Sequence, residues 1–548
     1  MAQIEHPKRG LIPLPDIDIL VPEFTNIAWE ACDKHVAEGR GDRVLFFFED
    51  QQITYKQLQI QVNKIGNALK RIGIKPGESV VIRSPNCPEL YAAVLAVMKI
   101  GAVAVPSQTL YKEREIEYVI NNSDGALIFA HPDVVGPVDA VRDKCPTLRH
   151  IVLFGPSDQD HIGFDDFIKD CSDQLECART RNDDEAYILY TSGTSGTPKG
   201  VVRMHRDPFA GGVPTSRHVS LCADDIFLHP FELTFGFVFA TLSAIIFSGS
   251  RFVMYTGRTQ VERILEFVEK YRVTKLGGAP SMFRMMLAIK DLESRYDLSS
   301  LQCFLSGGEV LPAETYRELK ERLGIETFDG FGQTEGCAII TQRPIFPVRP
   351  GSMGKPYPGI PLAVFDENGR YCPPNTTGFL VVRADSPNLF KEYKKMPEKW
   401  AEVHRFPGWY ATGDMAYFDD DGYYYWVGRA DAMIKSRGYL VSPKEVEDTV
   451  LEVPEVLEVA AVGSPDPVIG NRVKVFITLR PGVQSSGDLA EKVREHTRNR
   501  IAAYKVPKDI EFVSDLPKTN TGKLFRRPLQ ELEEDRYQKG ETAGFRFQ

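Results

Sequence analysis

The first 430 residues alternate short apolar runs with amphipathic stretches. Residues 78–86 form an apolar run typical of a buried strand, and residues 87–107 predict a helix that ends at Gly101, followed by a second strand. Short apolar runs at 126–130 and 150–155 continue this rhythm. Alternating helices and largely buried strands are typical of α/β layers. The pattern therefore predicts an α/β fold for this part of the chain.

After Gly428 the pattern changes. Ser442 is a predicted helix N-cap, Pro443 suits the first helical position, and Glu445 completes a capping box. The apolar face of this helix consists of Val446, Val450 and Val453.

Two strands, at 457–466 and 471–482, and a helix within 487–501 follow. This succession predicts a small α+β unit. We expect the charged turn GRADAMIKSRG to mark the boundary, giving domains at 1–430 and 431–548.

Composition adds limits on class and compartment. At 548 residues the chain exceeds the roughly 250–300 residues of a single core, so at least two domains are expected. The net charge of −9 argues against nucleic acid as the main partner. The nine cysteines are odd in number and form no C-x-x-C pair, which favours neither disulfides nor zinc and indicates a reducing cytoplasm.

Membrane integration is not expected. The N-terminal residues 1–20 lack the apolar centre of a signal peptide. The most apolar run, residues 235–249, is shorter than the ~18–20 residues that span a bilayer. We expect it to be a buried core segment.

The run LYTSGTSGTPKGVV, Leu189 to Val202, has the components of an anion-binding loop. Gly193, Gly196 and Gly200 allow the backbone to approach a ligand closely, and Lys199 adds a positive charge. The spacing matches neither G-x-x-x-x-G-K-[ST] nor G-x-G-x-x-G. A flexible linker is the alternative, but apolar strands on both flanks argue against it.

Four further motifs follow in order: LSGGEVLP (305–312), DGFGQTEG (329–336), WYATGDMAYFDDDGYYYWVGRAD (409–431) and PKTNTGKLFRR (517–527). Together with the anion loop they resemble the adenylate-forming superfamily of acyl-CoA synthetases, firefly luciferases and peptide-synthetase adenylation domains. The resemblance implies a large N-terminal α/β domain of several subdomains that binds AMP and the acid, and a small mobile α+β C-terminal domain.

The resemblance implies a nucleotide site. Glu335 is expected to hold Mg²⁺ and Thr334 to contact phosphate; one carboxylate suffices, because Mg²⁺ keeps waters and substrate phosphates as its other ligands. Asp414 is expected to accept hydrogen bonds from the ribose, with Arg429 as a second ribose or phosphate contact. The expected cofactor-binding residues are Thr191, Ser192, Gly193, Thr194, Lys199, Gly307, Gly308, Glu309, Asp329, Gly330, Phe331, Gly332, Asp414, Arg429 and Gly438.

The same resemblance implies a ligase with a two-step reaction, in which a carboxylic acid and ATP give an acyl-adenylate and pyrophosphate, and a thiol then attacks the acyl carbon and AMP leaves. Three residues are assigned roles in this reaction. Lys523 is expected to bridge the attacking carboxylate and the α-phosphate as charge shifts. Asp431 is the expected pivot of the small domain, and Gly438 leaves room for the thiol arm. With Lys523, Thr334 and Glu335 form the expected catalytic set.

The acid and the thiol are less closely specified. Only 21 residues follow Arg527, so coenzyme A is the expected acceptor. Residues 349–360 and the flanks of the later motifs look most like ligases of benzoate-type and medium-chain acids, which leaves aryl, alicyclic and medium-chain acids open. The expected acyl pocket consists of Leu233, Thr234, Phe235, Gly278, Phe283 and Ser306.

The chain departs from the family pattern at three places. Leu233 replaces a frequent histidine, which favours an apolar acid, while Ala432 and Leu440 change residues near the hinge. Two other functions stay open: a stand-alone enzyme that loads a carrier protein in trans, and a nucleotide-binding non-enzyme. Retention of Lys523, Glu335 and Asp414 argues against the second. No oligomeric state is predicted.

Overall fold

The computed structural model describes residues 11–191, 198–257, 259–436, 439–518, 524–541 and 546–547. Their contacts define two compact units. The first comprises Met1–Leu362 and Val382–Tyr410, and the second Ala363–Val381 and Ala411–Gln548. The predicted boundary at residue 430 is the expected pivot of the mobile C-terminal domain. Contacts within the structure do not test a pivot, so this boundary stays a prediction.

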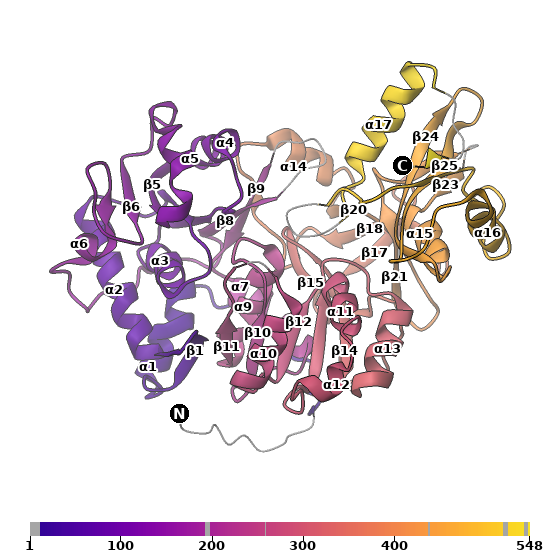
Figure 1. The fold of residues 1–548 in the computed structure, drawn as a ribbon. Coiled ribbons are helices and arrows are strands. Elements are labelled where there is room, and N and C mark those ends of the chain that lie inside the picture. Colours follow the sequence, from indigo (N-terminus) through magenta and orange to yellow (C-terminus); the bar gives the residue numbers. More distant parts are fainter. Residues whose placement is uncertain are drawn as a thin grey trace. The chain divides into compact units, whose positions relative to one another are not determined.

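A nine-stranded sheet forms half of the first unit, with the order β16-β15-β14-β13-β12-β10-β11-β1-β2 (Figure 1). The pairs from β14 to β1 are parallel, and antiparallel strands close both edges. Its strands are β1 (Val44–Phe48), β2 (Gln51–Thr54), β10 (Ile226–His229), β11 (Arg251–Met254), β12 (Lys275–Gly278), β13 (Cys303–Gly307), β14 (Glu326–Gln333), β15 (Gly336–Thr341) and β16 (Lys355–Pro356).

An eight-stranded sheet forms the other half, with the order β19-β9-β8-β4-β3-β5-β6-β7. It is parallel from β8 to β7 and antiparallel at β9 and β19. Its strands are β3 (Ser79–Arg83), β4 (Val103–Pro106), β5 (Gly125–Ala130), β6 (His150–Leu153), β7 (Ile162–Gly163), β8 (Glu185–Thr191), β9 (Lys199–Met204) and β19 (Glu392–Tyr393).

The first unit has five layers: the two sheets, the helices between them and the helices on the outer face of each sheet. Phe46 and Phe227 face one core and Phe47 and Leu228 the opposite one, because neighbours in a strand point to opposite faces. The outer core of the nine-stranded sheet involves α10 (Val261–Tyr271), α11 (Pro280–Leu287), α12 (Leu292–Arg295) and α13 (Ala313–Leu323). The middle core, shared by both sheets, involves α2 (Tyr55–Arg71), α3 (Pro88–Lys99) and α9 (Gly236–Ser248). Helices α4 (Glu113–Ser123) and α5 (Gly136–Asp139) pack outside the eight-stranded sheet.

Short helices complete the unit: the π-helix η1 (Trp29–Asp33), α1 (Lys34–Ala37), the 3₁₀ helices η2 (Pro132–Val134) and η3 (Arg142–Lys144), α6 (Phe164–Ile168), α7 (Asp207–Ala210), α8 (Gly212–His218) and α14 (Pro397–Val403). The predicted elements between 78 and 155 are confirmed as β3, α3, β4, β5 and β6. The apolar run 235–249 is α9, a core helix that ends at Gly249 with a left-handed φ of 68°. The first unit therefore has the α/β fold that the sequence pattern predicts.

The second unit holds a four-stranded sheet with the order β17-β18-β20-β21, built from β17 (Leu362–Phe365), β18 (Gly378–Arg383), β20 (Trp409–Phe418) and β21 (Tyr424–Arg429). Its six-stranded sheet consists of β22 (Ile434–Ser436), β23 (Tyr439–Val441), β24 (Val456–Asp466), β25 (Gly470–Leu479), β26 (Asp509–Phe512) and β27 (Arg546–Phe547). The helices are α15 (Pro443–Leu451), α16 (Gly487–Arg498) and α17 (Arg527–Gln538).

The local predictions for this unit hold with one correction. Ser442 is the N-cap of α15 and its hydroxyl accepts the Glu445 N–H at 3.3 Å. The predicted capping box is wrong, because the Glu445 carboxylate binds the Lys505 ammonium through both oxygens at 2.6 and 2.7 Å. A charged partner brought near by the fold competes with the local backbone N–H.

A buried group of four charges fixes α17 to the six-stranded sheet. Lys474 Nζ lies 2.7 Å from an oxygen of both Glu511 and Glu533, and Arg536 Nη1 contacts the same two carboxylates at 2.7 and 2.8 Å. Burial alone would raise the pKa of both carboxyls, but the two cations offset it and lower the pKa of each.

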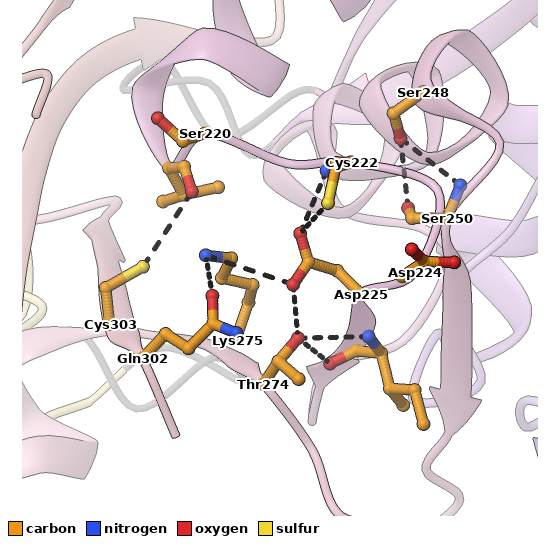
Figure 2. A network of polar contacts seen from close by, with 12 residues as sticks. Ser220, Cys222, Asp224, Asp225, Ser248, Ser250, Thr274, Lys275, Gln302 and Cys303 are labelled. Carbon is orange, nitrogen blue, oxygen red and sulfur yellow. Dashed lines mark hydrogen bonds and ion pairs between the residues drawn. The ribbon is translucent and has the colours of Figure 1, made fainter. Parts of the chain in front are cut away.

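Another polar network ties the amino ends of the parallel strands in the first unit (Figure 2). Asp225 accepts hydrogen bonds from Thr274 Oγ1 at 2.8 Å and from the Cys222 N–H at 2.9 Å. Lys275 donates to Gln302 Oε1 at 2.8 Å and lies 4.0 Å from Asp225. These residues lie at the starts of β10, β12 and β13. The network therefore does not occupy the carboxyl ends of the same strands.

All nine cysteines have free thiols. Among the described residues, no helix combines the length and apolar character needed to cross a membrane.

The buried pair of Lys99 and Asp33 gives a test of the packing. Lys99 Nζ lies 2.6 Å from Asp33 Oδ2 and 2.6 Å from Asn63 Oδ1, and only 1% of the Lys99 surface is exposed. We expect Lys99→Met to lower the free energy of unfolding by about 3–5 kcal/mol, because it strands a buried carboxylate. Urea denaturation measures this, and a loss below about 1 kcal/mol, as at an exposed pair, would contradict it.

Candidate active site

The strand order of the nine-stranded sheet reverses at β10. The chain passes from β10 to β11 on one side of it and then returns to β12 on the other. In open α/β sheets, ligands bind outside the carboxyl ends of the strands at such a switch point. The fold therefore directs attention to the residues that follow β10, β12 and β13, at the edge opposite the network in Figure 2.

The predicted acyl-pocket residues gather at this edge. Leu233, Thr234 and Phe235 lie on the loop between β10 and α9, and Gly278 is paired with Ser306 across β12 and β13. These residues are buried except Phe235, which is half-buried. The sixth, Phe283, is fully buried and packs on Phe304 with ring centroids 5.1 Å apart, so it belongs to the outer core; only its ring tip approaches Gly278.

Three buried polar side chains at this edge have no hydrogen-bond partner among the described residues. They are the Thr234 hydroxyl, the Ser306 hydroxyl and both ring nitrogens of His229. Burial lowers the pKa of His229 to about 3, so the imidazole is neutral at pH 7. Aromatic rings surround it, with Phe237 and Phe231 at centroid distances of 4.7 and 5.1 Å. His229 was not predicted as a site residue.

Glycines bring this aromatic group close to the strands. A Cβ on Gly277 would lie 2.9 Å from the His229 ring, and one on Gly307 would lie 3.0 Å from the Phe237 ring. Both distances are too short for ordinary contacts, so only glycine fits beneath these rings without movement.

The anion loop connects β8 to β9. Thr191 pairs with Lys199 at the base of this hairpin, while Ser192, Gly193 and Thr194 lie outside the described residues. Lys199 Nζ lies 5.3 Å from the centre of the Tyr393 ring, within the range of a cation–π contact.

Glu335 and Thr334 form the turn between β14 and β15. The Tyr393 hydroxyl donates to Glu335 Oε1 at 2.7 Å, and the other carboxylate oxygen has no partner among the described residues. A Cβ on Gly236 would lie 2.5 Å from Thr334 Oγ1, so the glycine that opens α9 lets this hydroxyl approach closely. The anion hairpin, Tyr393 and the Thr334–Glu335 turn thus come together in one unit.

The donor set fits Mg²⁺. In the part of the chain that the structure describes, no group of three or more His, Cys, Asp or Glu side chains could hold a metal ion. A single carboxylate with one unpaired oxygen is the protein contribution that Mg²⁺ needs when substrate phosphates and waters complete its shell.

Residues 307–309 and 329–332 lie beside this turn on β13 and β14. The Asp329 carboxylate accepts the Leu311 N–H at 3.1 Å and so holds the loop that contains Gly308 and Glu309. Gly308 has a left-handed φ of 86°. The backbone around Gly330, Phe331 and Gly332 is tightly packed: a Cβ on Gly330 would lie 2.4 Å from the His218 ring, and one on Gly332 would lie 2.9 Å from a backbone nitrogen.

In the second unit, Asp414, Arg429 and Asp431 form a charged group. Trp426 Nε1 donates to Asp414 Oδ1 at 2.9 Å, and Arg429 lies 3.4 Å from Asp414 and 3.6 Å from Asp431. Lys523 and Gly438 lie outside the described residues, so their roles stay predictions.

Tyr393, Arg203 and Trp426 were missed by the sequence reasoning. Tyr393 and Trp426 carry no local pattern that marks them. Arg203 does, because a charged residue interrupts the apolar strand VVRM.

Comparison with known proteins agrees with this arrangement. The AMP-binding enzyme family matches residues 33–394, and the AMP-binding enzyme C-terminal domain matches residues 445–523. Acetyl-coenzyme A synthetase of Bacillus subtilis is 33% identical over 93% of this chain and 90% of its own length. The human mitochondrial acyl-coenzyme A synthetase ACSM5 is 32% identical over 94% and 91%.

Solved structures have the same fold. The anthranilate CoA ligase AuaEII in complex with anthranoyl-AMP is 32% identical, covers 94% of this chain and 99% of its own, and has a TM-score of 0.87. A benzoate CoA ligase from Burkholderia xenovorans is 26% identical, with coverage of 92% and 99% and a TM-score of 0.84. The predicted resemblance and fold class are confirmed: the chain belongs to the AMP-binding enzyme family and is an AMP-forming acid–CoA ligase that uses ATP, Mg²⁺ and coenzyme A.

Proposed function

We propose that the enzyme activates aryl acids in preference to alicyclic and medium-chain acids. The observation that carries this proposal is the trio of Thr234, Ser306 and His229, which are buried without hydrogen-bond partners among the described residues, with aromatic rings around His229. Buried polar groups in native proteins are normally hydrogen-bonded, so these side chains call for a ligand that brings polar atoms of its own. A flat ring packs well on aromatic side chains.

A polar ring substituent fits this setting better than a plain chain. The neutral His229 imidazole offers one donor and one acceptor, and the two hydroxyls offer both. The anthranilate CoA ligase is in complex with anthranoyl-AMP, whose acyl group is an aromatic ring with an amino substituent. The polar trio modifies the expectation from Leu233, which taken alone favours a purely apolar acid.

We assign the nucleotide to the first unit's hairpin and turn. Thr191 and Lys199, with the loop between them, bind the phosphates; Thr334 contacts phosphate; and Glu335 is the protein ligand of Mg²⁺, which supplies charge neutralisation on the phosphates when bound. Asp414 and Arg429 bind the ribose. Most of the acceleration then comes from positioning and charge stabilisation.

The acid attacks the α-phosphate of ATP, pyrophosphate leaves, and the thiol of coenzyme A then displaces AMP from the acyl carbon. Lys523 stabilises the charge that shifts between carboxylate and phosphate in the first step. Rotation of the small domain about Asp431 exchanges this lysine for a thiol passage beside Gly438.

The free state of all nine cysteines supports a reducing, cytoplasmic location.

A panel of acids tests the proposed substrate. We expect kcat/KM for benzoate and 2-aminobenzoate to exceed that for cyclohexane carboxylate and hexanoate, and that for acetate to be at least about 100-fold lower than the best, because a single methylene already changes specificity 10–200-fold. Pyrophosphate release that depends on the acid, with coenzyme A as acceptor, is the measurement. Preference for acetate would reject the proposal.

Lys523→Ala tests the division of labour. We expect adenylate formation to fall by about 10²–10³-fold, the effect of losing one transition-state donor. Thioester formation from a premade acyl-adenylate should stay near the normal rate. Lys518→Ala is the matched control, since Lys518 belongs to the same sequence motif but pairs with Glu458 at 3.0 Å. Equal loss in both half-reactions would refute the role of Lys523.

A further inference from the structure

A buried arginine lies behind the proposed metal and phosphate turn. Arg203 is fully buried on β9, and it pairs with Asp207, which is 1% exposed. Arg203 Nε donates to Asp207 Oδ2 and Nη2 donates to Asp207 Oδ1, both at 2.9 Å. The Tyr187 hydroxyl, on the neighbouring strand β8, also donates to Asp207 Oδ2. The guanidinium is therefore held in one orientation by two strands and α7.

Nη2 of this guanidinium also donates to Cys337 Sγ at 3.6 Å, and Nη1 binds main-chain oxygens of the turn and of Asn388. Arg203 Nη1 donates to the carbonyls of Glu335 at 3.0 Å, Asn388 at 3.1 Å and Thr334 at 3.3 Å. The Glu335 carbonyl also accepts the Phe390 N–H at 2.7 Å. Two consecutive peptide groups, those that carry the Thr334 and Glu335 side chains, are thus fixed from inside the protein.

The same strand carries the cation of the anion loop. Lys199 and Arg203 share one face of β9, because side chains alternate along a strand and these two are four residues apart. Tyr393, which binds the Glu335 carboxylate, pairs with Val201 between them. Strand β9 therefore joins the anion loop, the Glu335 carboxylate and the Glu335 backbone.

Stability alone gives a poor reason for this arrangement. A buried ion pair often contributes no more stability than apolar side chains of similar volume, because desolvation offsets the attraction. Burial alone would lower the pKa of the Arg203 guanidinium, but the Asp207 carboxylate more than offsets this and raises it, so the group stays charged. The planar fork of arginine binds several oxygens in fixed directions, which a lysine does not reproduce.

We propose that Arg203, held by Asp207, is a positioning residue for the ATP half-reaction: it clamps the Thr334–Glu335 turn to the anion-loop hairpin at the spacing that Mg²⁺-bound triphosphate requires. The inference rests on the proposed role of Glu335. It makes Mg²⁺-dependent nucleotide binding, rather than folding, the property that Arg203 controls. A displacement of about 1 Å at such a site can cost about 10²-fold in rate.

Two variants of the clamp separate these properties. Arg203→Lys keeps the positive charge but loses the planar guanidinium that binds several oxygens at once. The double variant Arg203→Met with Asp207→Leu removes both charges, so that no unpaired buried charge remains. The matched control is Lys99→Met with Asp33→Leu, which removes another buried ion pair. The partners of this pair are Asn63 and Gln59, which lie far from the turn in sequence and outside the site described above.

The experiment measures the dissociation constant of ATP by calorimetry with Mg²⁺ and with EDTA, beside urea denaturation and the two half-reactions. We expect both Arg203 variants to reduce the gain in ATP affinity due to Mg²⁺ and to slow adenylate formation by about 10²-fold. Thioester formation from a premade acyl-adenylate should change less than about threefold, within the cost expected of a group outside that step. The control should keep the Mg²⁺ effect, whether or not its stability changes.

Three outcomes would overturn the inference. In the first, the Arg203 variants keep the wild-type Mg²⁺ effect. In the second, both half-reactions fall equally, as in a general loss of structure. If the double variant does not fold, Arg203→Lys alone decides between these results and the expected one. In the third, the wild-type protein shows neither acid-dependent pyrophosphate release nor a Mg²⁺ effect, which rejects the proposed function and the inference with it.

Discussion

The parallel ladder from β10 to β14 constrains everything else in the first unit. It sets successive carboxyl ends side by side, and the return of the chain to the other side of β10 opens the sheet edge there. Loops that are distant in sequence meet at this edge because each follows a strand of the same ladder. Polar contacts at the opposite edge, around Asp225 and Lys275, hold the amino ends together (Figure 2).

A reaction between a carboxylate and a triphosphate has to overcome the repulsion of two anions. The charged and polar groups proposed for this task lie on strand β9 or next to it. Strand β9 begins with Lys199 beside the anion loop and continues with Arg203 behind the Thr334–Glu335 turn, while Tyr393 on the adjoining strand orients the carboxylate. Because these groups are fixed before any ligand binds, little reorganisation is needed during the reaction.

Sequence reasoning succeeded where the signal is local. The cap at Ser442, the strands before and after 471 and the buried run at 235–249 follow from residues within a few positions of each other. It failed at Glu445, because Lys505, 60 residues away, takes that carboxylate. It missed Tyr393 for the same reason, because its partner Glu335 is 58 residues distant. Arg203 stands out locally as a charge in an apolar strand, but the carbonyls of Thr334 and Glu335 that it binds are 131 and 132 residues away, and only the fold brings them together. The motifs name candidate nucleotide-binding residues, but not the side chains that hold these candidates in place.

A crystal structure with MgATP and an unreactive analogue of the acid tests the central claim most directly. We expect the triphosphate to lie against the loop between Thr191 and Lys199, with the metal ion on the Glu335 carboxylate and the acid at the carboxyl ends of β10, β12 and β13. A nucleotide bound at the amino ends of those strands, or a metal ion away from Glu335, would contradict it.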